Sequence, residues 1–328
     1  MEPQPIVIKS KRLNVDIAYP GTIYHGTRFD WTGFITQVTL DNQHTFCVPE
    51  SYIPGKGTGG VGICNEFGID APVAYSSTSP GEVFPKLGIG LLKRPDEAEY
   101  DFFRTYEITQ PFPIEVTVED EQVSFIVLPI ECRGYAVQLN KTLKVSDNQL
   151  TIHYVLQNKG EQTIETNEYV HNFIGIDKQP IGPDYRLSFP YRITYENLAP
   201  SFRNMAPAFM RTLLPVPLLD MFLGSQIKKR RKVLAEEGNE IGFRFTPTTD
   251  FYTRLIGFTR TDKPQWEITH ISSGAGMREI DDFTPCRVAI WGVGHVVSAE
   301  IFVLIHLRPG EQMEWTRQFE FFSLPASI

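Results

Sequence analysis

One histidine and one glutamate attract attention because each interrupts a segment that otherwise looks like an apolar strand. His171 lies in EYVHNFIGID (168–177), and Glu300 lies in VVSAEIFVLIHL (296–307). An imidazole and a carboxylate can take up and release protons near neutral pH, as general acid–base catalysis requires. A histidine on a strand is also commonly a hydrogen-bonded structural residue, and a glutamate among apolar residues is commonly paired with an arginine. At this level both interpretations stay open.

Strand geometry places each of these two groups on the face of its strand opposite to the apolar face that can pack in the core. If residues 164–176 are extended, His171 shares one face with Tyr169, whereas Asn172 shares the other face with apolar residues. In the C-terminal segment Glu300 lies on a mixed face, opposite a wholly apolar one. A concave sheet surface with such polar groups and aromatic rings is suited to a ligand, for example a sugar, which needs hydrogen bonds at the ring edge and flat apolar surface for its C–H groups.

The rest of the chain shows the same period of two residues. Alternating segments occur at 33–40, 114–118, 123–130, 149–156 and 296–307. Turn sequences at 157–163 and 308–312 lie between or after such segments. These patterns predict an all-β protein with antiparallel hairpins. No repeat and no low-complexity linker divides the chain, so a single domain over residues 1–328 is predicted.

One region breaks the alternation. Between about 196 and 238 Pro and Met appear, and SQIKKRRKVLAEEG (225–238) is predicted to form a short helix with acidic residues near its end. Its basic run, 228–232, is either a nucleic-acid or localisation patch or a solvated helix face, and an acidic protein favours the second interpretation. The Gly-rich stretch 54–68 lacks the residue order of a phosphate-binding loop and is predicted to be a flexible loop.

Composition argues against several classes of function. The net charge of −8 opposes nonspecific nucleic-acid binding. No stretch approaches the roughly 20 apolar residues of a membrane helix, and no signal peptide is visible, so a soluble, cytoplasmic protein is expected. The cysteines lack metal-ligand spacing and are predicted to be reduced, mostly buried thiols; they are Cys47, Cys64, Cys132 and Cys286. The histidine spacing suggests no metal site either, so no metal is predicted.

Several segments together resemble the aldose 1-epimerase-like proteins of the galactose mutarotase-like superfamily. They are YHGTRFDWTGFI (24–35), NEFG (65–68), GEVFPKLGIGLLKR (81–94), EYVHNFIGID (168–177) and AIWGVGHVVSAEIFVLIHLRPGEQMEW (289–315). The resemblance covers most of the chain except roughly 196–250. It implies a large antiparallel β-sandwich, the galactose mutarotase-like supersandwich, with a sugar on its concave face. The segment 196–238 would be a short helical or irregular insertion in that fold.

The resemblance also implies roles for the two residues met first. His171 would be the general acid and Glu300 the general base. Opening a pyranose requires removal of the proton from the anomeric hydroxyl and protonation of the ring oxygen, and closure after rotation about the C1–C2 bond inverts C1. This chemistry needs no metal or cofactor. The two side chains are predicted to project into one accessible cleft, on opposite sides of a single pyranose, with Arg28 nearby.

Further sugar contacts follow from the same resemblance. Arg28 would face the sugar because a guanidinium binds vicinal oxygens well, and the alternative is an internal ion pair with Asp30. Asn172, next to His171 in its motif, is predicted to contact the substrate. Glu66, in NEFG, is predicted to lie at the rim of the site.

One position departs from the family pattern. Mutarotases usually have a second histidine early in the chain, and Lys86 stands in the comparable segment here. Lys86 either holds a sugar hydroxyl, a carboxylate or a phosphate, or it pairs with Glu82 at the surface. Trp291 and His295 precede the Glu300 strand and are predicted to wall the pocket, with a core position as the alternative for Trp291.

Two classes of function are therefore predicted. The first is an aldose 1-epimerase-like isomerase, a mutarotase that interconverts sugar anomers. The second is a noncatalytic carbohydrate-binding or sugar-sensing protein on the same fold. The presence of both His171 and Glu300 favours the enzyme, and the missing histidine favours the binding protein. The expected partner is a monosaccharide or sugar derivative, with no nucleic acid and no membrane, and the protein is expected to be a monomer or a homodimer.

Overall fold

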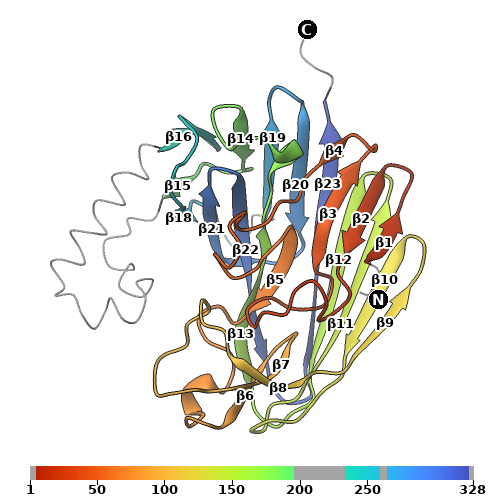
Figure 1. Cartoon of the computed structure of the whole chain (residues 1–328), viewed down its shortest axis with the longest axis vertical. Coiled ribbons are helices and arrows are strands. Elements are labelled where there is room, and N and C mark those ends of the chain that lie inside the picture. Colours follow the sequence, from red (N-terminus) through yellow and green to blue (C-terminus); the bar gives the residue numbers. More distant parts are fainter. Residues whose placement is uncertain (1–4, 196–232, 259–263, 325–328) are drawn as a thin grey trace, which may run out of the picture.

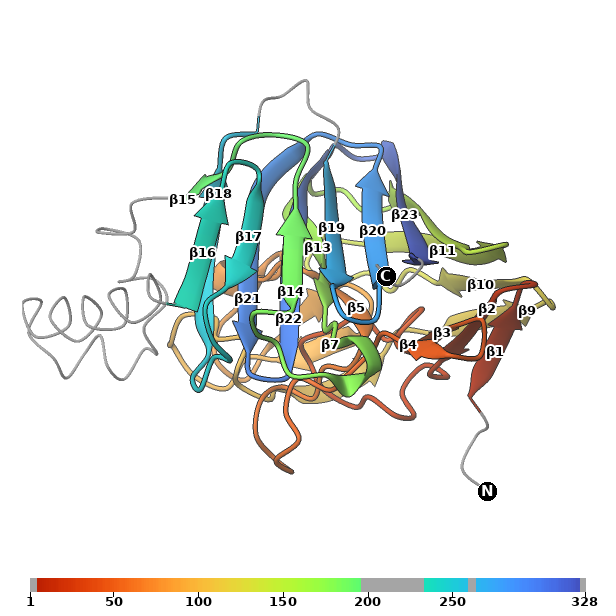
Figure 2. The ribbon, with the colours of Figure 1, turned by 90° about the horizontal axis from the view of Figure 1, so that it is seen from above.

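Two large antiparallel β-sheets make up most of the molecule and lie face to face (Figure 1, Figure 2). The structure is a computed structural model that describes residues 5–195, 233–258 and 264–324. Strand pairing within these ranges is antiparallel, so the predicted all-β sandwich is confirmed. The fold therefore agrees with the period-two patterning of the sequence.

The first sheet contains the segments that carry His171 and Glu300. Its strands are β1 (Ile6–Lys9), β2 (Leu13–Ile17), β3 (Ile35–Leu40), β4 (His44–Thr45), β5 (Ile63–Phe67), β13 (Ile164–Asn172), β15 (Thr194–Tyr195), β18 (Phe251–Ile256), β21 (Pro285–Val293) and β22 (Val296–Leu307). Their order is β1-β2-β3-β5-β13-β22-β21-β18-β15, with β4 paired to β3. The strands β13 and β22 are thus neighbours in the middle of the sheet.

The second sheet covers one face of the first. Its strands are β9 (Ile114–Val118), β10 (Gln122–Val127), β11 (Val137–Ser146), β12 (Gln149–Asn158), β14 (Tyr185–Ser188), β16 (Leu234–Glu237), β17 (Glu240–Phe243), β19 (Gln265–His270), β20 (Ala275–Asp281) and β23 (Gln312–Ser323). Their order is β16-β17-β14-β19-β20-β23-β12-β11-β10-β9.

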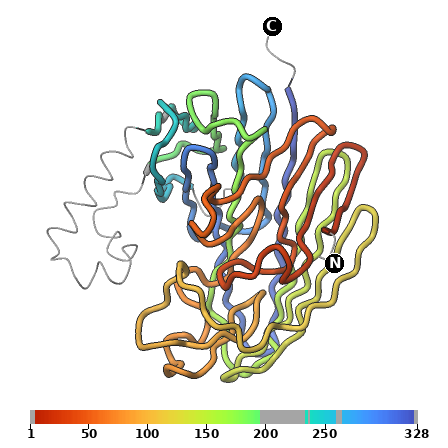
Figure 3. Tube along the Cα trace, in the orientation of Figure 1, coloured from red at the N-terminus to blue at the C-terminus, as the bar shows by residue number. Residues whose placement is uncertain are grey.

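A small third sheet lies near one end of β13 and β5 (Figure 1), in the orange to yellow part of the trace at the bottom of Figure 3. It consists of β6 (Val83–Lys86), β7 (Gly90–Lys93) and β8 (Glu107–Pro111). Two short 3-10 turns, η1 (Tyr75–Ser77) and η2 (Ile176–Lys178), complete the regular structure of the described residues. The third sheet brings the segment around Lys86 against β5.

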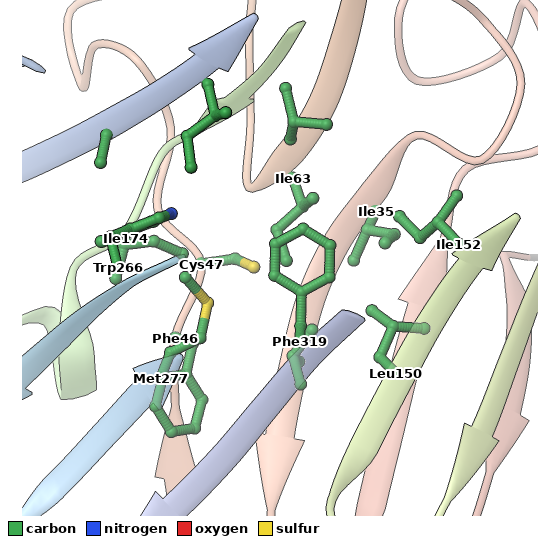
Figure 4. Close-up of a cluster of buried hydrophobic side chains, with 14 of the residues drawn as sticks. Ile35, Phe46, Cys47, Ile63, Leu150, Ile152, Ile174, Trp266, Met277 and Phe319 are labelled. Carbon is green, nitrogen blue, oxygen red and sulfur yellow. The ribbon is translucent and has the colours of Figure 1, made fainter. Parts of the chain in front are cut away.

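The core lies between the two large sheets. The buried side chains drawn in Figure 4 come from both of them and include Ile35, Ile63, Leu150, Ile152 and Phe319. Along β12 every second residue is buried, as the alternation of its sequence predicts. Each fully buried aliphatic or aromatic side chain of this kind contributes about 1.5–3 kcal/mol. The opposite face of the first sheet is not part of this core.

One local prediction is wrong. The stretch 225–238 was expected to be helical, but Leu234–Glu237 forms β16 and pairs with β17. The turn between them contains Gly238 with φ 68. A Gly–Asn pair between apolar segments favours a tight hairpin, because glycine adopts positive φ without strain. The rest of the predicted insertion 196–238, with its basic run 228–232, lies outside the described residues.

Two predictions from composition can be compared with the structure. All four cysteines are free; Cys47, Cys64 and Cys132 are buried and Cys286 is exposed. In the described ranges, no helix has the length and apolar character that crossing a membrane requires. The single-domain organisation over 1–328 stays a prediction.

Candidate functional site

The backbone pairing of β13 and β22 is interrupted where His171 and Glu300 lie. Pairing ends at Tyr169, opposite Phe302, and resumes further along the strand in a single bridge at Ile174. The register is the same on both sides of this gap, so the histidine and the glutamate stand opposite each other. On its other edge β13 stays paired with β5 through Asn172, which keeps the strand in place.

Side chains replace the backbone bonds across the gap. The backbone N–H of Asn172 donates to Ser298 Oγ at 3.1 Å, and Asn172 Nδ2 donates to the carbonyl of Ala299 at 2.9 Å. Arg317 Nη2, which comes from the second sheet, donates to the carbonyl of Ile301 at 3.0 Å. The carbonyls on either side of the glutamate are thus held by side chains from the interior of the sandwich.

His171 and Glu300 are in direct contact. His171 Nε2 lies 3.2 Å from Glu300 Oε1, and the two side chains are only 5% and 4% exposed. Burial raises the pKa of Glu300 to about 7, against the opposing effect of Arg28 and Arg287. Burial, aided by the positive charge of Arg28, lowers the pKa of His171 well below its usual value of 6.5. Near neutral pH the imidazole is therefore uncharged and the carboxyl group can gain or lose a proton.

Aromatic rings hold the imidazole in place. The His171 ring stacks on Phe173 with centroids 3.9 Å apart, and it meets the rings of Trp291 and Phe29 edge to face at 5.3 and 6.0 Å. His171 Nδ1 is buried and has no hydrogen-bond partner in the part of the chain that the structure describes. A buried polar atom without a partner is a position where a ligand or a water can bind.

Arg28 lies beside this pair and is fixed by a buried carboxylate. Arg28 Nε donates to Glu66 Oε2 at 2.9 Å, and Nη2 donates to the Tyr169 hydroxyl at 2.9 Å, which in turn donates to Glu66 Oε2 at 2.8 Å. Arg28 Nη1 donates to Thr58 Oγ1 at 3.0 Å. The half-buried ring of Phe102 covers the guanidinium carbon, with its centroid at 4.3 Å. Arg28 is therefore near the pair, as predicted, and rigidly oriented.

The alternative partner proposed for Arg28 is wrong. Asp30 pairs with Lys141 instead, with 3.3 Å between Oδ2 and Nζ, and both side chains are buried. The alternation argument failed because the segment around Asp30 forms turns and bends rather than a strand. Lys141 reaches it from β11 of the second sheet, a contact that no local pattern reveals.

Lys86 and Glu66 form the support of the site rather than its rim. Lys86 Nζ donates to the carbonyl of Phe67 at 2.7 Å, to the Tyr100 hydroxyl at 3.1 Å and to Glu66 Oε1 at 3.3 Å. These three acceptors use all three N–H donors of an ammonium group. Lys86 and Glu66 are both 0% exposed, so the predictions of a ligand contact for Lys86 and of a rim position for Glu66 are corrected. The predicted surface pair of Lys86 is also wrong, because Glu82 pairs with Arg133.

Asn172 does not face the site. It is 0% exposed, and its Nδ2 donates to Glu279 Oε2 at 3.0 Å inside the sandwich. Consecutive residues of a strand point to opposite faces, so Asn172 and His171 cannot both contact one ligand directly. Its predicted substrate contact is therefore corrected to a structural contact.

The predicted accessible cleft is wrong, because the side chains of His171 and Glu300 are only 5% and 4% exposed. The predicted sugar position is also corrected, because their 3.2 Å contact leaves no room for a pyranose between them. Residues directly opposite each other on neighbouring strands have Cβ atoms about 4.5–5.5 Å apart, which brings long side chains together. The two oxygens that react in a pyranose, the anomeric hydroxyl and the ring oxygen, are bonded to the same carbon. An adjacent acid and base can therefore meet one edge of the ring.

The remaining predicted residues lie at different distances from the pair. Trp291 is half-buried and contacts the His171 ring, so it lies where a wall was predicted. His295 instead holds a loop: its Nε2 lies 2.9 Å from the carbonyl oxygen of Pro49, and its ring lies 4.5 Å from that of Tyr52.

Sequence reasoning missed several residues that build the site. Tyr169 links Arg28 to Glu66, and alternation had already placed it on the face of His171. Tyr100 and Thr58 come from loops, where no period indicates which way a side chain points. Those two contacts had no usable signal in the sequence.

Comparison with known proteins identifies the fold. No family model and no curated protein matches the chain. Among solved structures, a galactose mutarotase-like protein from Lactobacillus casei superposes with a TM-score of 0.55 at 12% identity, covering 97% of this chain and 100% of that one. A galactose mutarotase-like protein from Clostridium acetobutylicum gives 0.55 at 10% identity, with 97% and 95% covered. The GalM/aldose epimerase homologue from C. elegans gives 0.52 at 11%, with 98% and 99% covered.

These similarities extend over nearly the whole chain. At 10–12% identity they show that the protein has the galactose mutarotase-like fold, in agreement with the resemblance found in the sequence. They leave activity and substrate to be argued from the site itself.

Proposed function

We propose that the protein is an aldose 1-epimerase-like isomerase that interconverts the anomers of a sugar by opening and closing its ring. The observation that carries this proposal is the contact between Glu300, whose pKa is raised to about 7, and His171, whose pKa is lowered. A base with a pKa near neutrality beside an uncharged imidazole is suited to moving one proton at a time.

The proton transfers can be assigned to these two groups. The Glu300 carboxylate removes the proton of the anomeric hydroxyl, the C1=O bond forms, and the bond from C1 to the ring oxygen breaks. His171 Nε2–H donates its proton to the ring oxygen in the same step in which Nε2 takes up, across their 3.2 Å contact, the proton that Glu300 has received. The imidazole is therefore neutral before and after the transfer. After rotation about the C1–C2 bond, the same steps in reverse close the ring with C1 inverted.

Arg28 supports this assignment through its charge. Its guanidinium opposes the rise in the pKa of Glu300 and contributes to the lowered pKa of His171. The result is a pair that exchanges a proton without holding a full positive charge on the imidazole. A neutral imidazole that donates a hydrogen bond to a reacting oxygen is an established role for histidine.

A noncatalytic sugar-binding protein is the second candidate. The near-complete burial of the pair, with side chains 5% and 4% exposed, favours this alternative, because catalysis requires a sugar to reach these two residues and binding elsewhere on the fold does not. The use of all three Lys86 donors within the protein also favours it, since no cation at that position can replace the missing histidine.

Polarimetry on freshly dissolved single anomers separates the two candidates. Neutral, phosphorylated and acidic sugars are supplied in turn, and the approach to optical equilibrium is timed. Glu300→Gln keeps the shape of the side chain but removes the base, so we expect the rate to fall by roughly 10²–10⁴-fold while sugar affinity changes far less. If the unmutated protein binds sugars but accelerates none of them, the enzyme proposal fails and the binding protein remains.

Glu165→Gln is a matched control for this experiment. Glu165 contacts His306 across the same two strands, with 3.2 Å between Oε1 and Nδ1, but the two side chains are 75% and 53% exposed. We expect this variant to keep the rate of the unmutated protein. A similar fall in both variants would show that the loss is not specific to the buried pair.

A further inference from the structure

A pocket of about 290 Å³ lies on the same face of the first sheet as Glu300. Its lining includes Asp70, Asn167, Arg254, Phe258, Arg287 and Leu304. Arg287 pairs with Phe302 in the β21–β22 ladder, two residues along β22 from Glu300. Two residues of a strand span about 7 Å, and their side chains point to the same face. The pocket therefore begins about one sugar ring away from the proposed base.

The charges of this pocket differ from those of the whole protein. Two arginines and a single carboxylate, that of Asp70, are among its lining residues, whereas the chain carries a net charge of −8. A local excess of positive charge on an acidic protein attracts anions to that place. Guanidinium groups bind carboxylate and phosphate oxygens through paired N–H donors.

Arg287 is held in a fixed orientation with donors to spare. Its guanidinium carbon lies 3.7 Å from the centroid of the Phe302 ring. Its bonds to Asp70 are long, 3.3 and 3.4 Å from Nη1 to the two carboxylate oxygens, and the Asp70 side chain is 67% exposed. Arg287 Nε is buried and has no hydrogen-bond partner among the described residues. The Arg287 guanidinium is therefore suited to an anionic ligand, because its Nε–H has already lost contact with water before a ligand binds.

We propose that this pocket is an anion subsite and that the sugar bound by the protein carries a phosphate or a carboxylate on the exocyclic carbon attached to C5. The anion would lie against Arg287 and Arg254 while C1 meets Glu300 and His171. The placement of C1 rests on the proposed function. The spacing of about 7 Å along β22 suits a single ring with its anion on the carbon attached to C5.

Calorimetric titration with four probes tests the subsite. The probes are D-glucose, D-glucose 6-phosphate, D-glucuronate and inorganic phosphate, each at low ionic strength. A hydrogen bond to a charged group contributes about 1.5–3 kcal/mol, so we expect at least one anionic sugar to bind roughly 10- to 100-fold more tightly than glucose. The stronger of the two identifies phosphate or carboxylate as the anion. Equal affinities for glucose and both anionic sugars overturn the proposal.

Three variants test whether the preference for an anionic sugar comes from this pocket. Arg287→Gln should lose most of the preference for the anionic sugar while it keeps the affinity for glucose. Asp70→Asn should strengthen the preference, because it removes the carboxylate that competes for Arg287. Arg12→Gln removes the same charge from a distant pair with Asp41 and should leave the preference unchanged. Asp70 is exposed, so its variant stays informative even if the Arg287 variant does not fold. A preference that survives Arg287→Gln, or falls in Asp70→Asn, overturns the subsite.

The outcome is independent of catalysis, because binding is measured without turnover. An anion preference that depends on Arg287, without acceleration of any anomer, supports the subsite and overturns the isomerase. Acceleration of neutral sugars without any anion preference does the reverse.

Discussion

The strands β13 and β22 carry two His–Glu pairs whose atoms are the same distance apart. His171 and Glu300 meet at 3.2 Å inside the protein, and His306 and Glu165 meet at 3.2 Å near the other end of the same strands. The first pair is 5% and 4% exposed, and the second is 53% and 75% exposed. The two contacts also differ in the ring nitrogen involved, Nε2 in His171 and Nδ1 in His306, but the largest difference between them is solvent exposure.

This difference teaches that contact alone does not create a proton-exchanging pair. Water and salt screen the exposed charges, so a surface ion pair contributes little. Removing water disfavours the charged form of each buried group, which raises the pKa of Glu300 to about 7 and lowers that of His171. Chemistry is therefore expected at the buried pair, and the exposed pair is its internal control.

The largest expected effect is on catalysis. His171→Asn can still donate a hydrogen bond but cannot deliver a proton, so we expect anomer interconversion to fall roughly 10²–10⁴-fold. The double variant with Glu300→Gln should be little worse than either single variant, because the two transfers act as a unit. Polarimetry measures both, and His306→Asn is the matched control. Equal losses of rate in the two histidine variants would show that burial does not distinguish the His171–Glu300 pair from the exposed pair.

The second expected effect is on the pH dependence of stability. The pKa of Glu300 is raised from 4.5 to about 7 by folding, so the folded protein binds more protons than the unfolded chain between these values. Glu300 therefore stabilises the protein most below pH 4.5, and about 3 kcal/mol of this advantage over Gln is lost as the pH rises through about 7. His171 has the opposite sign, since its lowered pKa makes stability rise with pH up to about 6.5.

Urea unfolding of the Glu300→Gln variant isolates the Glu300 contribution, because His171 is present in both proteins. The difference in unfolding free energy between the unmutated protein and the variant should decline from pH 4.5 to 7.5. Parallel stability curves for the Glu300 variant and the unmutated protein would contradict the raised pKa.

The third effect concerns the residues around the buried pair. Tyr169→Phe removes the hydroxyl that accepts from Arg28 and donates to Glu66, and it leaves a buried N–H without its partner. We expect a loss of about 1–3 kcal/mol in the free energy of unfolding. Tyr154→Phe is the control, because the Tyr154 hydroxyl is buried without a partner in the described part of the chain. A loss of the same size in both variants would show that the Tyr169 network contributes nothing specific.

The smallest effect is expected at the exposed pair. A double-mutant cycle with Glu165→Gln and His306→Asn should give a coupling of about 0.2–1 kcal/mol, and added salt should reduce it. Urea unfolding at low and high ionic strength measures both quantities. A coupling of several kcal/mol that resists salt would mean that exposure does not distinguish the two pairs.

Much of the fold and part of the site could be predicted from sequence. Alternation is a local property, so it predicted β9 and β22 with their observed bounds and placed His171 and Glu300 on mixed faces. It also placed Asn172 on the opposite face, and the substrate contact assigned to Asn172 came from the family motif instead. At Asn172 the two arguments disagreed and strand geometry was correct, whereas alternation failed for Arg28 and Asp30, whose segment is not a strand.

The rest depended on contacts between distant segments. Lys86 meets Glu66 because the third sheet packs against β5, and the sequence contains no period that links these strands. The direct contact of His171 with Glu300 required the register of β13 on β22, which is set by the whole ladder. The strand at Leu234–Glu237 had a usable signal in the Gly–Asn pair that follows it, but the basic run before it suggested a helix.

At the gap in the β13–β22 ladder, the separation of His171 and Glu300 can be changed by substitutions at neighbouring positions. Next to the buried pair, Asn172 and Ser298 link the two strands, so the link depends on side-chain identity rather than on backbone geometry. A larger or smaller residue at either position would change the separation of His171 and Glu300 without replacing either one. Single substitutions beside the reacting groups, in evolution or in protein engineering, can therefore change proton exchange between His171 and Glu300. The paired ends of the ladder keep the sheet intact.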